Sequence, residues 1–476
     1  MRKTKIVATI GPASNSVEKI KELFQAGMNA ARINFSHGDH ESHGETIDKV
    51  IKVREELGLP IPLILDTKGP EIRTKLLKEE PVELKKGSTF TLTTDDIEGD
   101  ETKVSVTYAD ITKDLKVGST VLIDDGLIEL TVKEITGNDV ICEVINSGLL
   151  GSRKGVNLPD VHLGLPALAE KDINDIKFGI KKGFDYIAAS FIRSADDIKE
   201  IRKVLAENGG SAIKIISKIE NREGVDNLDE ILEATDGIMV ARGDLGVEIP
   251  LEEVPVIQKE MIRKCREKGK LVITATQMLE SMVNNPRPTR AEANDVANAI
   301  FDGTDAIMLS GETAKGKYPV EAVQTMVKIA SKVESSIDYA KEFSNPSNFK
   351  ASNVTDAIAH ATCTTAADLN AACILAVSKS GFTVQQVAKF RPVCQINAFT
   401  PDERVRRQLN LIWGCYPNML QNITTTGSDL FEAATDTAFK LGNTKEGDIV
   451  VIVGGTPVGI EGTTNTLKVH VVTENN

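Results

Sequence analysis

The sequence predicts an α/β protein: a (β/α)8 TIM barrel with an all-β lid domain inserted after barrel strand 3, followed by a C-terminal α/β open-sheet domain. Three patterns support this prediction. Eight short apolar runs each end in polar residues and lead into an amphipathic helical segment. The helical period disappears over residues 71–166, and a polar break at residues 342–353 precedes a shorter unit of strands and helices. The expected domains are the catalytic barrel (1–70 and 167–340), the inserted β-barrel lid (71–166) and the C-terminal α/β regulatory domain (341–476).

The eight apolar runs carry the barrel prediction. Alternating strands and helices imply a parallel sheet, and eight such units imply a closed barrel whose functional groups lie at the C-terminal ends of the strands. In the first helix, Val17, Ile20 and Phe24 share a face, while Asn15 and Glu18 have capping-box spacing. A doubly wound open sheet is the alternative that this pattern leaves open. The runs are KIVATIGP, AARINFSHG, LILDTKGPEIR, YIAASFIR, IKIISKIEN, IMVARGD, LVITATQM and AIMLSGETAKG.

The other two domains are predicted from shorter segments. In the insertion, STFTLTT, TKVSVTY, STVLIDDGLIELTV and NDVICEVI are separated by Gly, Asp and Asn, which is typical of antiparallel hairpins. An all-β module in a βα loop lies at the functional end of a barrel, where it can cover a site. In the C-terminal domain we expect a helix near residues 354–369 and the strands CILAVS, VCQINAF, DIVVIV and LKVHVVT.

Composition excludes several classes of protein. The chain has 476 residues and a net charge of -13, which argues against nucleic acid or an anionic membrane as a partner. No run approaches the roughly 18 apolar residues of a membrane span. The N-terminus leads directly into a strand pattern and does not resemble a signal peptide. The six cysteines are scattered without a C-x-x-C pair, as expected for reduced thiols in a cytoplasmic protein.

Polar side chains gather at the predicted strand ends. Residues two apart in a strand point to the same face, so the sharing of a face can be read from the spacing. If the barrel closes, six charged side chains converge on one opening: Arg32, Asp66, Lys218, Glu220, Arg242 and Asp244. The neighbouring polar residues on the same faces or strand ends are Asn34, Ser36, Ser190, Thr274 and Thr276.

The charged residues favour phosphoryl transfer. Glu220 and Asp244 offer hard oxygen ligands suited to Mg²⁺. Arg32 and Lys218 suit a phosphoryl group, Arg as a planar fork and Lys as a point charge. Cations beside a divalent ion on carboxylates are the means by which phosphoryl transfer is catalysed. For any single residue, an ion pair that plugs the rim of the barrel is an equally good explanation, but six such residues at the functional end argue against it. Glu248, further along the same segment, is interpreted as structural.

Two other motifs are weaker. GETAKGKY (residues 311–318) matches the P-loop spacing, but Tyr318 stands where the motif needs Ser or Thr for Mg²⁺. His37, His40 and His43 are spaced three apart and suggest a zinc site. On a helix, however, the first and third would lie about 120° apart, so we expect solvated histidines at a helix entry.

The ordered motifs identify a family. The sequence resembles pyruvate kinase over essentially its whole length, in the bacterial type without the extra C-terminal domain that some members carry. The motifs in family order are NFSHG, LDTKGPEIRT, KGVNLP, SKIEN, MVARGDLGVE, TATQMLESM, RPTRAEANDVANAI and LSGETAKGKYP.

The resemblance implies transfer of the phosphoryl group of phosphoenolpyruvate to ADP, giving pyruvate and ATP. Mg²⁺ (or Mn²⁺) is then expected on Glu220 and Asp244. The other catalytic residues implied are Lys218, which stabilises the phosphoryl group and the enolate, Arg32, which grips the phosphate, and Thr276 on the side where the enolate is protonated. The substrate carboxylate is expected at the backbone of Arg242, Gly243 and Asp244 with Thr276, and Ser190 lies beside the substrate. The group that gives the proton stays open.

The resemblance also implies a second ion and a nucleotide site. K⁺ is expected at Asn34, Ser36, Asp66 and Thr67. Glu71 stands where potassium-independent members carry a lysine, which implies that this chain depends on K⁺. ADP or ATP is expected to contact Arg73, Lys154, His37 and Asn34.

Regulation is implied for the C-terminal domain. SKSGFT (residues 378–383) joins a strand to a helix and offers hydroxyls and amides to an anion. The family places a sugar-phosphate effector there, at Ser378, Lys379, Ser380, Gly381 and Thr383, with GGTPVGIEGTTNT (residues 454–466) as the closing loop. An ordinary capped turn is the alternative, a nucleotide effector is equally compatible, and the family suggests a homotetramer. A Mg²⁺-dependent lyase or aldolase of the same barrel type stays open as an alternative function.

Overall fold

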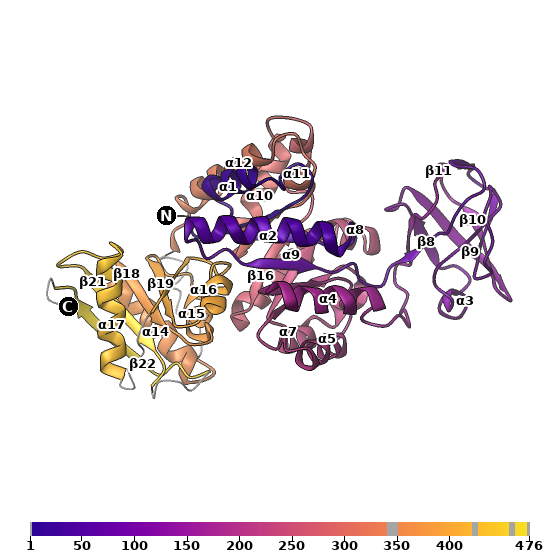
Figure 1. Ribbon diagram of the computed structural model, residues 1–476. Helices are drawn as coiled ribbons and strands as arrows, with labels where there is room; N and C mark the ends of the chain where they lie inside the picture. The colour runs from indigo at the N-terminus through magenta and orange to yellow at the C-terminus, as the bar shows by residue number, and fades with distance from the viewer. Residues whose placement is uncertain (1, 340–350, 421–426, 457–461, 474–476) are drawn as a thin grey trace.

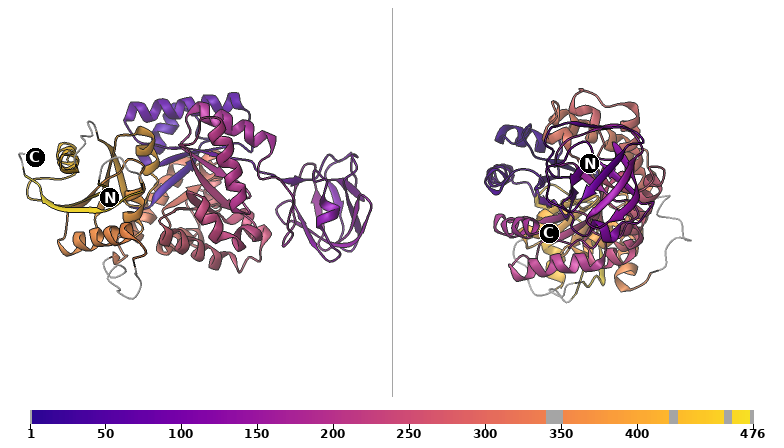
Figure 2. Two further views of the ribbon diagram at one scale, coloured as in Figure 1. Left: turned by 90° about the horizontal axis from the view of Figure 1, so that it is seen from below. Right: turned by 90° about the vertical axis from the view of Figure 1, so that its right-hand side faces the viewer.

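A computed structural model describes residues 2–339, 351–420, 427–456 and 462–473. Figure 1 shows three bodies in a row, and Figure 2 shows the same order from other sides. The barrel lies in the middle, with the β-rich insertion at one end and the C-terminal domain at the other. Among the helices of the described residues, none is long and apolar enough to pass through a membrane.

The central body is a closed parallel barrel, which confirms the prediction and rules out an open sheet here. Its strands follow the order β1-β17-β16-β15-β14-β13-β3-β2. All eight predicted runs form these strands, and β2 pairs with both β1 and β3 in parallel. The strands are β1 (Lys5–Thr9), β2 (Ala30–Asn34), β3 (Leu63–Asp66), β13 (Tyr186–Ala189), β14 (Lys214–Ile219), β15 (Gly237–Ala241), β16 (Leu271–Ala275) and β17 (Ala306–Leu309).

Helices surround the barrel. In the first of them, Ile20, Leu23 and Phe24 are buried as expected, but the cap is Ser16 and not Asn15, because the Ser16 side chain accepts from the Lys19 amide. The helices are α1 (Val17–Ala26), α2 (His40–Leu57), α4 (Glu170–Lys182), α5 (Ala195–Glu207), α6 (Arg222–Asp226), α7 (Leu228–Ala234), α8 (Arg242–Glu248), α9 (Val254–Lys268), η1 (Glu280–Val283), α10 (Arg290–Asp302), α11 (Gly311–Ala314) and α12 (Pro319–Glu334).

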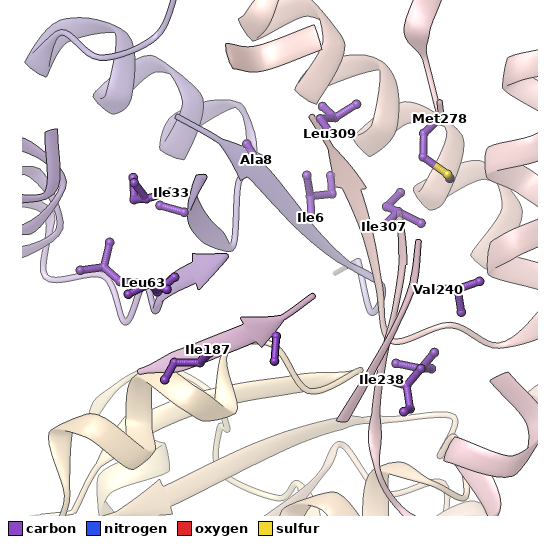
Figure 3. Packing of buried hydrophobic residues seen from close by; sticks show 14 of the residues in the cluster. Ile6, Ala8, Ile33, Leu63, Ile187, Ile238, Val240, Met278, Ile307 and Leu309 are labelled. Carbon is purple, nitrogen blue, oxygen red and sulfur yellow. The ribbon is translucent and has the colours of Figure 1, made fainter. Parts of the chain in front are cut away.

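Strand alternation divides the core of the barrel into two layers. Outward-facing residues such as Ile6, Ile238 and Ile307 pack against the helices, as Figure 3 shows. Inward-facing residues such as Ile64 and Ile216 fill the barrel itself. The inward rows continue toward the C-terminal strand ends, so that Ile64 is followed by Asp66 and Ile216 by Lys218. The charged side chains therefore lie at the level of the barrel where the apolar filling ends.

The insertion is a β-module of its own. It has a seven-stranded sheet in the order β4-β12-β8-β9-β10-β6-β7 and a two-stranded sheet of β11 and β5. The strands are antiparallel as predicted, except that β6 and β7 pair in parallel. The four predicted segments contain β6 to β10, whereas β4, β5, β11 and β12 are two or three residues long and give no periodic signal. The elements are β4 (Ile72–Arg73), β5 (Val82–Leu84), β6 (Thr89–Thr93), β7 (Lys103–Ser105), α3 (Ile111–Asp114), β8 (Thr120–Ile123), β9 (Ile128–Thr136), β10 (Asp139–Val144), β11 (Gly148–Leu150) and β12 (Gly155–Asn157).

The C-terminal domain is an open sheet in the order β20-β19-β18-β21-β22, parallel except for β22. The predicted helix and four predicted strands are present. The fifth strand, β20, was missed because CYPNM contains a proline and has no apolar alternation. The elements are α14 (Val354–Asp368), β18 (Cys373–Val377), α15 (Phe382–Ala388), β19 (Gln395–Thr400), α16 (Glu403–Leu409), β20 (Cys415–Met419), α17 (Gly427–Lys440), β21 (Ile449–Gly454) and β22 (Thr466–Val471).

This domain docks on the N-terminal end of the barrel. Asp185 and Asp305, which directly precede β13 and β17, form buried ion pairs with Arg407 and Arg391 at 2.9 and 2.8 Å. Apolar residues of the domain also belong to the same core cluster as the barrel filling. The lid and the C-terminal domain therefore contact opposite ends of one barrel.

Candidate active site

A shared carboxylate organises the mouth of the barrel. Asp66, at the end of β3, is almost completely buried and accepts from Arg32 Nε at 2.6 Å and from Lys218 Nζ at 3.2 Å. Arg32 also donates to the hydroxyl of Thr9 at 2.8 Å. Burial opposes the charge on Asp66, but the two cations outweigh it and lower its pKa. The structure thus brings the two predicted phosphate-binding cations to one point.

Lys218 is the centre of this network. Its Nζ lies 2.8 Å from Glu220 Oε1 and donates to Ser190 Oγ at 2.7 Å. Burial works to lower the pKa of Lys218, yet the carboxylates of Asp66 and Glu220 outweigh burial and raise it. The ammonium is therefore charged at neutral pH, and it is held by Asp66 at the end of β3, by Ser190 just after β13 and by Glu220 just after β14.

Glu220 stands immediately after β14 and is 1% exposed. Its second oxygen accepts from the amide of Phe191 at 2.7 Å. Phe191 has a φ of 55°, a left-handed conformation that is strained for a bulky residue and that aims this amide at the carboxylate. Burial raises the pKa of Glu220, and the charge of Asp244 adds to the effect. A buried carboxylate repelled by another is suited to share a divalent cation with it.

Asp244 lies in the first turn of α8, beside Thr276. Thr276 follows β16 with a left-handed backbone, and its hydroxyl accepts from the Gly243 amide at 2.7 Å. A Cβ at Gly243 would lie 3.5 Å from Thr276, an ordinary van der Waals distance, so the contact with Thr276 does not itself require glycine. The helix start and Thr276 therefore form one wall of the opening.

The prediction that Arg242 and Asp244 share a strand face is wrong. β15 ends at Ala241 and α8 begins at Arg242, and on a helix residues two apart point about 200° apart. The Arg242 guanidinium instead donates to Asp295 at 2.6 Å and to the carbonyl of Thr276 at 2.7 Å. Arg242 therefore anchors α8 to the loop after β16, and its side chain does not face the opening.

A cavity of about 600 Å³ lies between the barrel and the lid. Its lining includes Asp244, Arg73 and Lys154, so two predicted nucleotide residues share a chamber with a predicted metal ligand. Arg73 is paired with Glu71 at 2.7 Å, and Lys154 with Asp124 at 2.9 Å. The other two predicted nucleotide residues, Asn34 and His37, are outside this lining in the part of the chain that the structure describes.

The four predicted K⁺ residues lie on adjoining strand ends. Asn34 and Asp66 are register partners of β2 and β3. Asn34 Oδ1 accepts from the Ser36 amide at 3.1 Å, and Thr67 Oγ1 accepts from the Ser190 amide at 3.1 Å. Carboxylate, amide and hydroxyl oxygens that gather in this way suit a hard monovalent cation.

The structure does not support a P-loop. After β17 the chain forms the short helix α11 and a tight turn, in which the amides of Lys315 and Gly316 donate to the Gly311 carbonyl at 3.0 and 2.9 Å. The Lys317 amide donates to Val283 O. These donors are the ones a P-loop would turn toward phosphate, and here they are already engaged.

The histidine triplet does not form a zinc site either. His40 Nε2 lies 2.7 Å from Asp175, and its ring stacks on Phe178, whereas His43 packs on Phe35 with 4.3 Å between the ring centroids. Across the described residues, no group of three or more His, Cys, Asp or Glu side chains is arranged to hold a metal.

In the C-terminal domain, residues 378–383 form the predicted strand-to-helix turn. Ser378 Oγ accepts from the Gly381 amide at 3.0 Å, and Gly381 has a φ of 84° that suits glycine. Thr383 is hydrogen-bonded to Thr464 at 2.8 Å, so this turn lies against the end of the predicted closing loop. Residues 457–461 of that loop are outside the described residues.

Sequence reasoning missed several residues that shape the site. Thr9 orients Arg32, Phe191 orients Glu220, and Asp124 holds Lys154. The sequence signal for Asp124 is the tripeptide Asp-Asp-Gly, which is typical of a hairpin turn and indicates that Asp124 lies at a hairpin tip. The roles of Thr9 and Phe191 depend on pairing between distant strands and leave no local pattern.

The fold and the site together define a class: a barrel phosphotransferase with paired cations beside paired carboxylates. Comparison with known proteins then defines the family. The chain matches the model of the pyruvate kinase barrel domain over residues 1–323 and that of the pyruvate kinase alpha/beta domain over residues 356–470. The chain therefore belongs to the pyruvate kinase family.

Individual relatives agree. A pyruvate kinase from Clostridium acetobutylicum is 54% identical, with 99% of this chain and 100% of that protein covered. One from Geobacillus stearothermophilus is 52% identical, with coverage of 99% and 81%. A solved structure of a pyruvate kinase from Cryptosporidium parvum superposes with a TM-score of 0.93 at 42% identity, covering 99% of this chain and 96% of that one. These matches do not favour the lyase alternative.

Proposed function

We propose that this chain transfers the phosphoryl group of phosphoenolpyruvate to ADP, with Lys218 as the central catalytic residue. In this step the bond between phosphorus and the enol oxygen breaks, a bond to a terminal oxygen of ADP forms, and the enolate takes up a proton at its methylene carbon. The observation that carries the proposal is the placement of Lys218, between Asp66 and Glu220 and beside Arg32, on the interior face of the strand ends.

Each residue then has a distinct task. Arg32 binds the phosphate oxygens, and Lys218 neutralises charge on the moving phosphoryl group and on the enolate oxygen. The Gly243 and Asp244 amides with Thr276 hold the substrate carboxylate, for which the Gly243 amide exchanges its present acceptor, the Thr276 hydroxyl. Ser190 positions Lys218, because its hydroxyl accepts from the ammonium. Arg242 contributes through the backbone that it anchors. The proton donor to the enolate stays open.

Glu220 and Asp244 are the residues that would hold Mg²⁺ or Mn²⁺. Their fit rests on the donor set: Glu220 follows β14, and Asp244 lies in the first turn of α8 after the neighbouring strand β15, so two hard carboxylate ligands stand at adjoining strand ends. Burial raises the pKa of Glu220 and the charge of Asp244 adds to the effect, which a divalent cation would relieve. When bound, this ion supplies positive charge that stabilises oxygens in the transition state.

The nucleotide is proposed to lie in the cavity between the barrel and the lid. Arg73 and Lys154 face the same chamber as Asp244, and phosphates would replace Glu71 and Asp124 as their partners. A cavity of about 600 Å³ is within the range of small-molecule sites. We assign His37 and Asn34 to the edge of this site, since both lie at the end of β2.

A coupled assay tests the function. Pyruvate formation from phosphoenolpyruvate should require ADP and should yield ATP in equal amount. A lyase of the same barrel type has no use for ADP, so pyruvate that appears at the same rate without ADP would contradict the proposal.

Dependence on K⁺ yields a prediction about Glu71. With tetramethylammonium in place of K⁺ at equal ionic strength, the initial rate of the native protein should fall by at least about 10-fold. The variant Glu71→Lys should lose this dependence, because its ammonium would supply a fixed charge near Asn34, Ser36, Asp66 and Thr67. Glu71→Gln removes the carboxylate without adding a cation and should not rescue. Equal behaviour of the Lys and Gln variants would refute the role given to position 71.

The remaining parts of the proposal concern regulation. We assign the turn formed by Ser378, Lys379, Ser380, Gly381 and Thr383 as the site of a phosphorylated effector, either a sugar phosphate or a nucleotide. Barrel 1–70 and 167–340, lid 71–166 and regulatory domain 341–476 are the units we propose, in a homotetramer that acts in the cytoplasm. A titration of rate against phosphoenolpyruvate with a panel of sugar phosphates and nucleotides identifies the effector.

A further inference from the structure

We propose that Glu248 is a positioning residue. Through its hydrogen bond with Asn157, it fixes the position of the lid relative to α8, the helix that carries the proposed metal ligand Asp244. This inference rests on the proposed function, because it concerns how Lys154 and Asp244 are held relative to each other. It revises the interpretation of Glu248 as merely structural.

The hydrogen bond joins the two elements that carry these groups. Asn157 Nδ2 donates to Glu248 Oε1 at 2.7 Å. Asn157 is the last residue of β12, which Lys154 directly precedes, and Glu248 is the last residue of α8, which carries Asp244. Residues four apart on a helix lie on one face, so Asp244 and Glu248 both line the cavity.

The lid side of this bond is firmly connected to the nucleotide cations. β12 pairs with β4 at Gly155 and Arg73, and with β8 at Val156 and Ile123. Lys154 is in turn paired with Asp124, which follows β8. A displacement of Asn157 would therefore carry both Arg73 and Lys154 with it.

The lid approaches the same turn of α8 from a second direction. A Cβ at Gly126 would lie 3.8 Å from Val247 Cγ1, so the hairpin tip reaches the residue beside Glu248. The lid thus lies near the final turn of α8 at Gly126, in addition to the hydrogen bond from Asn157.

Helix stability does not explain a carboxylate at this position. An anion at the C-terminal end of a helix is opposed by the helix dipole. Burial, together with the charges of Asp160 and Asp244, also raises the pKa of the Glu248 carboxyl. Within the described residues, the hydrogen bond to this carboxylate comes from Asn157, and it crosses from the lid to the barrel. The unfavourable free energy of placing a carboxylate at this position is therefore offset by the hydrogen bond to the lid and not by an interaction within α8.

The test compares four variants of the full-length protein: Glu248→Ala, Glu248→Gln, Asn157→Ala and the double variant. Glu248→Ala should raise KM for ADP about 10-fold, the effect of losing one hydrogen bond. KM for phosphoenolpyruvate and the affinity for Mn²⁺ should stay within about 2-fold, since Glu220 is untouched. Glu248→Gln keeps an acceptor oxygen and should restore a near-native KM. The double variant should be no worse than either single one.

Glu252→Ala is the matched control, because this carboxylate is exposed, lies four residues further along the chain, and should change none of these constants. A thermal melt of each variant distinguishes a variant that does not fold from one that folds with the lid displaced relative to α8. If Glu248→Ala does not fold, Asn157→Ala carries the same prediction from the lid side.

A native KM for ADP in the Ala variants, additive effects in the double variant, or failure of Gln to rescue would each overturn the inference. If the native protein forms pyruvate without ADP, the proposed function fails instead, and the two failures are distinguishable.

Discussion

Replacing Lys218 by methionine is expected to lower kcat by roughly 10³-fold or more, while KM for phosphoenolpyruvate changes only a few-fold. The ammonium lies where charge develops on the phosphoryl group and the enolate, so its contribution is larger in the transition state than in the bound substrate. Methionine has a similar length without the charge. Initial rates across substrate concentrations measure both constants.

Lys317→Ala is the control for this experiment. Lys317 is the lysine of the P-loop-like motif, and its backbone amide is bonded to Val283. Its replacement should have a mild effect on turnover. Near-native kcat in Lys218→Met, or a collapse of turnover in Lys317→Ala, would show that the central residue has been assigned wrongly.

The second large effect is expected for Glu220→Gln. This change removes one of two proposed metal ligands and one partner of Lys218, so Mn²⁺ should bind at least about 100-fold more weakly and activity should nearly vanish. Titration of Mn²⁺ followed by electron paramagnetic resonance measures the affinity without requiring turnover.

A second buried carboxylate provides the control for Glu220→Gln. Glu312 accepts from the amides of Leu279 and Ser310 near the end of β17. Glu312→Gln should lower thermal stability yet leave Mn²⁺ affinity unchanged. If both variants weaken Mn²⁺ binding equally, general disturbance of the barrel explains the loss and the ligand role of Glu220 falls.

Much of the site could be predicted because, in a closed barrel, the alternation of side chains along each strand determines which residues point into the barrel. Asp66 and Lys218 follow inward-facing residues by two positions, so their meeting needed only the eight strands and their parallel order. The same rule failed for Arg242 and Asp244, because the strand ends at Ala241, before both residues, and a helix begins at Arg242.

Other features depend on contacts that no local pattern records. The strand β12 is three residues long, and the bond from Asn157 to Glu248 spans 91 positions of the chain. The left-handed backbone of Phe191 is imposed by its surroundings and not by residue type. Such features follow from how distant segments pack, and a single sequence does not specify them.

The most direct test is a crystal structure with Mn²⁺ and oxalate, an analogue of the enolate of pyruvate, in which anomalous scattering locates the ion. The account predicts one ion in contact with a carboxylate oxygen of Glu220 and one of Asp244, with Lys218 beside the analogue. An ion bound elsewhere, or carboxylates that point away from each other around an empty space, would contradict it.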